Sequence, residues 1–156
     1  MTAKTIDGKW IYRSYLSEAS FTSITDIEPD KAQEFIKELI WATGELEART
    51  GADGQVTGTL QFPSGITLAV KGSITQDKGG CPDSFQGTGM GEIPQGENTL
   101  QLSYQLEGWF IPDVTNVPEE ITTEQKPTLV GSITHLGNFN DPKQPGYVGT
   151  FILVKV

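Results

Sequence analysis

The sequence predicts an all-β fold, an eight-stranded antiparallel up-and-down barrel with one short helix inserted after the first strand. From Ile40 onward, apolar and polar residues alternate with period 2 in stretches of about ten residues, as in half-buried strands. Turn residues such as Pro63-Ser64-Gly65 separate these stretches. Eight stretches match the strand number of a small closed barrel, and closure leaves no exposed sheet edge.

The expected strands share this alternation and these boundaries, and they cover residues 8–16, 40–50, 55–62, 66–75, 84–92, 99–111, 128–136 and 147–156. The helix is expected over residues 29–39. Pro29 suits a first helical position, and the apolar residues that follow at helical spacing are Ala32, Phe35, Ile36 and Leu39.

A glycine followed two residues later by a large apolar residue recurs in seven of the expected strands. Both residues then lie on one face of the strand. The pairs are Gly8/Trp10, Gly44/Leu46, Gly58/Leu60, Gly72/Ile74, Gly108/Phe110, Gly131/Ile133 and Gly149/Phe151. Two explanations are open: the glycines let strands coil tightly enough to close a small barrel, or they leave an internal cavity.

The glycine-bearing face is mostly apolar and is expected to point inward, whereas the opposite face is rich in Thr, Ser, Gln and Lys. The last strand departs from this pattern, because its outer face carries Val148, Ile152, Val154 and Val156. The helix over 29–39 could cover this apolar strip, or a second subunit could cover it in a homodimer. The sequence does not choose between them.

Composition restricts the classes of function. A length of 156 residues predicts one domain over residues 1–156, and the net charge of −9 argues against nucleic-acid and membrane partners. A single cysteine, Cys81, excludes an intramolecular disulfide framework. One histidine and dispersed carboxylates provide no metal cluster, so neither a metal nor another cofactor is expected. Without an apolar N-terminal segment, the expected location is the cytoplasm.

Gly8-Lys9-Trp10 in the first strand and Lys155 in the last resemble the signature of the calycins, the superfamily of lipocalins and avidins. The resemblance implies a barrel whose final-strand cation packs over the indole at a closed end, as a cation–π contact would favour. The helical insertion is atypical of avidins, and the lipocalin disulfide cannot form here. The segments Pro127–Ser132 and Gly146–Lys155 also resemble an ending of uncharacterised bacterial proteins, which implies no function.

Few groups are candidates for chemistry. Gly87-Thr-Gly89-Met-Gly91 lacks the following helix of a dinucleotide loop. His135 lies on the apolar side of its strand, where an imidazole acts as acid or base, or packs at the rim of the core. Tyr12 and Tyr104 could hydrogen-bond a ligand carbonyl if they project into a cavity, although packing with the hydroxyl at the barrel mouth is the commoner arrangement.

These observations lead to one expected function and two alternatives. The expected function is binding of a small, mainly apolar organic molecule inside the barrel. The first alternative is a cofactor-free cyclase or isomerase acting on a hydrophobic biosynthetic intermediate, with His135 as the catalytic residue. The second is a solid-core assembly module without ligand. The expected ligand-binding residues are Trp10, Tyr12, Tyr104, Phe110 and Phe151, with Lys155 bracing the closed end.

Overall fold

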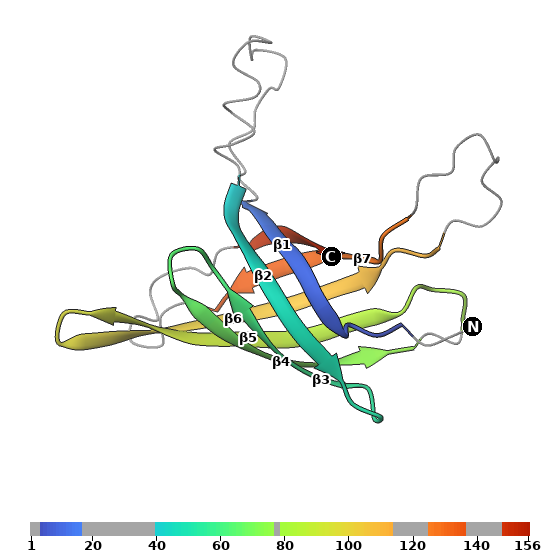
Figure 1. Ribbon diagram of the computed structural model, residues 1–156, viewed down its shortest axis with the longest axis horizontal. Helices are drawn as coiled ribbons and strands as arrows, with labels where there is room; N and C mark the ends of the chain where they lie inside the picture. Colours follow the sequence, from blue (N-terminus) through green and yellow to red (C-terminus); the bar gives the residue numbers. More distant parts are fainter. Residues whose placement is uncertain (1–3, 17–39, 77–78, 114–124, 137–147) are drawn as a thin grey trace, which may run out of the picture.

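The protein is a closed eight-stranded barrel in which each strand is antiparallel to the next and β1 pairs with β8 (Figure 1). The computed structural model describes residues 4–16, 40–76, 79–113, 125–136 and 148–156. Within these ranges every regular element is a strand, which confirms the all-β, up-and-down prediction. The helix predicted over 29–39 lies outside the described residues.

The strands follow the predicted order and begin and end within three residues of the predicted boundaries. They are β1 Gly8–Leu16, β2 Ile40–Thr50, β3 Gln55–Gln61, β4 Thr67–Thr75, β5 Ser84–Gln95, β6 Asn98–Phe110, β7 Thr128–His135 and β8 Val148–Lys155. The largest difference is at the end of β5, which continues to Gln95 instead of ending at residue 92.

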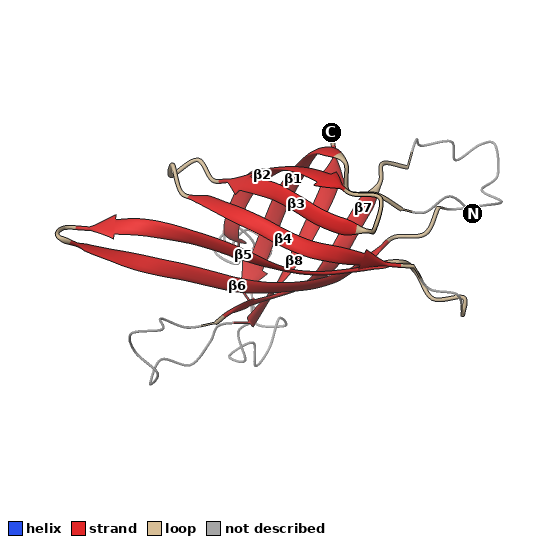
Figure 2. Cartoon of the chain, turned by 90° about the horizontal axis from the view of Figure 1, so that it is seen from below, coloured by secondary structure: helices blue, strands red, loops and turns tan. Residues whose placement is uncertain are grey.

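The β5–β6 hairpin is longer than its neighbours and extends past the barrel as a two-stranded ribbon (Figure 2). The register of β4 on β5 ends at Ala69 opposite Met90, whereas β5 continues to pair with β6 as far as Gln95. Pro94 therefore lies where β6 is the only neighbouring strand among the described residues, a position that tolerates a missing N–H.

The inward face is the apolar one, as predicted, and its side chains form one continuous core. Trp10, Leu60, Leu106 and Leu129 are among its buried members. One residue expected on the solvated face is instead buried: Ser103 is 4% exposed. The Leu136 N–H donates to the Ser103 carbonyl, so the chain leaving β7 runs beside this position.

The inward glycines mark close contacts and not empty space. Gly72 lies directly opposite Gly87, and a Cβ on Gly87 would lie 2.6 Å from Cζ of Phe85. Gly108 lies opposite Gly131, and a Cβ on Gly131 would collide with the backbone of Glu107. The coiling explanation is therefore supported at these positions. The cavity explanation is wrong for them, because neighbouring backbone and aromatic rings fill the space.

Candidate functional site

One end of the barrel is filled by large side chains. This closed end is where β1 begins and β8 ends, and it lies toward the N-terminus label in Figure 1. Ile6 and Trp10 are both 0% exposed, and Trp10 Nε1 donates a hydrogen bond to the Ile6 carbonyl at 2.8 Å. The ring of Phe110 meets that indole edge-on, with centroids 6.5 Å apart. These three residues form a solid floor.

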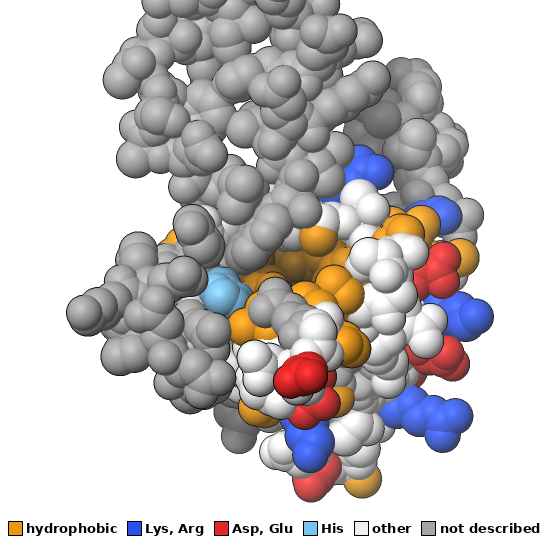
Figure 3. Space-filling model, turned by 90° about the vertical axis from the view of Figure 1, so that its left-hand side faces the viewer, with side chains coloured by type: hydrophobic (Ala, Val, Ile, Leu, Met, Phe, Trp, Pro, Cys, Tyr) orange, Lys and Arg blue, Asp and Glu red, His pale blue; other side chains and the backbone are white. Residues whose placement is uncertain are grey.

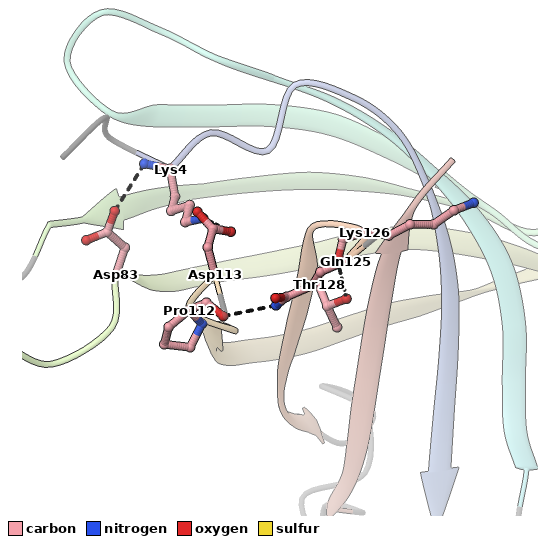
Figure 4. A network of polar contacts seen from close by, with 7 residues as sticks. All are labelled: Lys4, Asp83, Pro112, Asp113, Gln125, Lys126 and Thr128. Atoms are coloured by element: carbon pink, nitrogen blue, oxygen red, sulfur yellow. Dashed lines mark hydrogen bonds and ion pairs between the residues drawn. The ribbon is translucent and has the colours of Figure 1, made fainter. Parts of the chain in front are cut away.

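The segment before β1 is tied across this closed end (Figure 4). The Lys4 backbone N–H donates to Asp83 Oδ2 at 3.1 Å, and its Nζ forms an ion pair of 2.9 Å with Asp113. The Ile6 N–H donates to Thr50 Oγ1 at 3.0 Å. Contacts from two connections and from the end of β2 therefore hold this segment, and with it Ile6, at the floor.

The residues that resemble the calycin signature are neighbours in the structure. Trp10 and Lys155 lie directly opposite each other across the β1–β8 pair and therefore share a face. Gly8 has φ of +99°, a left-handed conformation that glycine adopts readily. A Cβ on Gly8 would lie 3.6 Å from Cε of Lys155, so the lysine stem passes close to this glycine.

The middle of the barrel holds a buried tyrosine. Tyr12 is 1% exposed, stacks on Phe151 at a centroid distance of 6.2 Å and meets Phe62 edge-on at 6.0 Å. Burial raises its pKa to about 12, and a side-chain hydrogen bond with Ser14 partly offsets that effect. Ser14 is itself 1% exposed, so a neutral hydroxyl pair lies under the open end.

The open end, where β1 ends and β8 begins, retains incompletely buried apolar surface. Figure 3 shows this end as a hollow with hydrophobic side chains in its depth and the chain's histidine at its edge. Among the described residues, seven hydrophobic ones pack against the core without being fully buried. Register and chain order place all of these but Ile74 toward the open end: Ala42, Phe62, Ile66, Ile93, Leu100 and Tyr104.

A tyrosine–histidine pair provides polar chemistry at the open end. Tyr104 and His135 are direct cross-strand neighbours, and their ring centroids are 5.0 Å apart with an interplanar angle of 50°. Both are half-buried. Burial raises the pKa of Tyr104, so its phenol stays protonated at neutral pH and can donate a hydrogen bond.

The structure divides the predicted site residues into separate levels. Trp10, Phe110 and Lys155 belong to the closed end, where the first two are enclosed by protein. Tyr12 and Phe151 stack in the middle, and only Tyr104 and His135 lie at the open end.

Sequence reasoning did not select three residues that contribute to the floor or to the surroundings of the buried tyrosine. Ile6 precedes the first strand, so no periodic pattern marks it as part of the core. Phe62 and Ser14 follow the inward periodicity and could have been selected as site residues from it, because both surround the buried tyrosine.

The described residues do not bring together three or more side chains of the types that ligate metals. In the same parts of the chain, no helix has the length and apolar character needed for a membrane span. Among the described residues that face inward at the open end, the polar side chains include the phenol of Tyr104, the hydroxyl of Ser14 and the imidazole of His135.

Comparison with known proteins gives no match: no family model, no curated protein and no solved structure is significantly similar to the chain.

Proposed function

We propose that the protein binds a small, mainly apolar organic molecule at the open end of the barrel interior. The observation that carries this proposal is the contrast between the two ends. The closed end buries Ile6 and Trp10 completely, whereas six described hydrophobic residues toward the open end pack against the core and keep exposed surface. Covering such surface with a ligand is favourable by about 25 cal/mol per Å².

The polar groups of the open end favour a neutral ligand with one hydrogen-bond acceptor. Among the described residues that face inward there, none is Lys, Arg, Asp or Glu. The protonated phenol of Tyr104 can donate to a carbonyl or ether oxygen, and the His135 imidazole can donate or accept. Apolar contact would supply the affinity, and these two side chains would set the ligand's orientation.

The architecture is compatible with a calycin-like fold over residues 1–156, and we propose that assignment with a specific division of labour. Trp10, Phe110 and Lys155 form the base of the barrel. Tyr12 and Phe151 separate that base from the ligand, which contacts the residues above them. The interior of an eight-stranded barrel is filled by side chains or holds one small ligand, and the proposed division places the filled part below the ligand.

The proposal is tested with N-phenyl-1-naphthylamine, a neutral fluorophore whose emission rises in apolar surroundings. We expect the wild-type chain to bind it and Ile66→Ala to weaken binding roughly tenfold, because about two methylene equivalents of contact are lost. Ile74→Ala is the matched control, since Ile74 is also a partly buried core neighbour but lies near the closed end.

Two outcomes would contradict the proposal. Absence of probe binding to the wild-type chain would favour the solid-core assembly module. Equal effects of the two isoleucine variants would mean that the probe does not occupy the open end.

Trp109→Gln tests for adsorption on the exterior, because Trp109 is 51% exposed on the outer face of β6. We expect that variant to leave probe affinity unchanged.

The Tyr104–His135 pair supports a second candidate, a cofactor-free isomerase or cyclase for a hydrophobic intermediate. An isomerisation that removes a proton from one carbon and returns it to another consumes no co-reactant, and an imidazole can carry that proton. The compound recovered from the native complex by mass spectrometry would be incubated with fresh protein. Loss of product in His135→Gln with unchanged probe binding would indicate catalysis, whereas an unaltered compound would indicate a carrier.

A further inference from the structure

A hydrophobic strip crosses the outside of four adjacent strands. Two rows of cross-strand neighbours form the strip, each running from β1 through β8 and β7 to β6. The first row consists of Arg13 on β1, Ile152 on β8, Val130 on β7 and Trp109 on β6. In the next row, Ile11 lies opposite Val154 and Val154 opposite Thr128, whose carbonyl accepts the Ile111 N–H. We name the six apolar members the outer strip: Ile11, Trp109, Ile111, Val130, Ile152 and Val154.

The outer strip is exposed where an ordinary barrel exterior would be polar. Ile11 is 52% exposed, Trp109 51% and Ile111 38%, and the other three members, Val130, Ile152 and Val154, are partly exposed. On the other side of the barrel, the outward residues of β3 include the exposed Thr57 and Thr59. Contiguous apolar surface of this kind marks an interaction site in a protein whose remaining exterior is solvated.

We propose that a second copy of this chain covers the outer strip, related by a twofold axis parallel to the strands. Such an axis places β1 of one copy against β6 of the other. Ile11 then faces Ile111 of the second copy, and Ile152 faces its Val130. Val154 faces Thr128 of the second copy, so the contacts at the centre are apolar except at this threonine. The same patch is used by both copies, as in an isologous interface.

Charge selects this orientation. The same axis places the Arg13 guanidinium on the indole of Trp109 in the second copy, a favourable cation–π arrangement. Glu107, the next outward residue of β6, lies within reach of the same guanidinium. An axis perpendicular to the strands and centred between the two rows would instead place Arg13 against Ile11 of the second copy, where the buried charge would have no aromatic or acidic partner.

Charge also explains why this face is suitable for contact between copies. Each copy carries a net charge of −9, so two copies repel each other over most of their surface. The two rows contain no Asp or Glu, and Arg13 is their only charged residue. The strip is therefore the place where two acidic barrels can meet with little electrostatic cost.

Sedimentation equilibrium of the full chain over a range of concentrations tests the proposal. We expect a monomer–dimer equilibrium in which Trp109→Gln raises the dimer Kd by about 30-fold, as for other tryptophans that act as interface hot spots. Met90→Gln is the matched control, because Met90 is also 51% exposed but lies on β5 outside the strip.

Two results of that experiment overturn the proposal. One is a chain that stays monomeric at its highest soluble concentration, which would result if residues 17–39 covered the strip. The other is a dimer to which Trp109→Gln and Met90→Gln are equally harmless. Neither result bears on probe binding at the open end, so this proposal and the proposed function can fail separately.

Thiol crosslinking tests the orientation of the axis. In a Cys81→Ser background, Ile11→Cys and Ile111→Cys chains are prepared separately and treated with a short bis-maleimide. We expect a covalent dimer only when the two variants are mixed, since each position faces the other. Crosslinking of either variant alone would overturn the proposed axis. In the proposed dimer the two copies of either position are at least about 14 Å apart, across three strand spacings, which is too far for the reagent.

Discussion

Gly72 and Gly87 face each other across the β4–β5 pair with no room between them for a methyl group. A Cβ on Gly72 would collide with the Gln86 carbonyl, and one on Gly87 would lie 2.7 Å from the Lys71 carbonyl. The ring of Phe85 covers both positions, at 2.7 Å and 2.6 Å from these hypothetical atoms. The two strands can therefore approach and coil closely only because neither residue has a side chain.

This relationship predicts a sharp difference between neighbouring glycines of β5. Gly87→Ala is expected to reduce the free energy of unfolding by about 1–3 kcal/mol, the usual cost of overpacking a core. Gly89→Ala is expected to change it by less than about 1 kcal/mol, because its Cβ would meet Leu68 and Leu106 only at 3.5 Å and 3.7 Å. Urea unfolding followed by tryptophan fluorescence measures both. Equal losses in the two variants would contradict the close-contact explanation.

The buried phenol of Tyr12 predicts a loss of stability in alkali. Its pKa is about 12 in the folded chain and near its ordinary 10.0 when unfolded, so the folded state holds the proton more tightly. The resulting contribution, about 3 kcal/mol, is complete below pH 10 and is lost as the pH rises toward 12. Urea unfolding at about pH 9 and about pH 11 measures the decrease.

Tyr12→Phe is the control for this pH dependence. The variant loses the hydrogen bond with Ser14, which shifts stability by a constant amount. It also loses the titrating hydroxyl, so its stability should fall less between the two pH values than that of the wild-type chain. A parallel decrease in both proteins would show that other groups cause the alkaline loss.

The hydrogen bond from Trp10 to Ile6 predicts a stability cost specific to the closed end. Trp10→Phe leaves the buried Ile6 carbonyl without this donor, and we expect a loss of about 1–3 kcal/mol. Trp109→Phe is the comparison, since that indole is 51% exposed, and we expect less than about 0.5 kcal/mol. Both are measured at chain concentrations where the wild type is monomeric. A negligible effect of Trp10→Phe would mean that the bond does not hold the floor together.

The phenol of Tyr104 predicts selectivity between two apolar probes. Tyr104→Phe should weaken binding of Prodan, which carries a ketone, by roughly 2- to 10-fold through loss of one hydrogen bond. Binding of N-phenyl-1-naphthylamine, which has no carbonyl, should be unchanged. Fluorescence titration of both probes gives the comparison. A similar change for both probes would mean that Tyr104 contributes packing and not hydrogen bonding.

Much of the fold could be read from local patterns. The alternation in Thr67–Thr75 identifies its inner and outer faces, because successive side chains of a strand point to opposite sides. The recurring glycines identify the inner face in the same way. The far end of β5 could not be predicted, because Pro94 is acceptable only where β4 has already ended, and this depends on the register between strands.

The sequence by itself determined where the strands lie, the inward face and the presence of an apolar exterior on the last strand, since each follows from residues a few positions apart. Only the tertiary structure decided which end of the barrel is filled. Ile6, Trp10 and Phe110 come from distant parts of the chain, and their contact depends on barrel closure and on the segment tied down by Lys4. For the same reason, residues predicted as one site, such as Trp10 and His135, lie at opposite ends of the barrel.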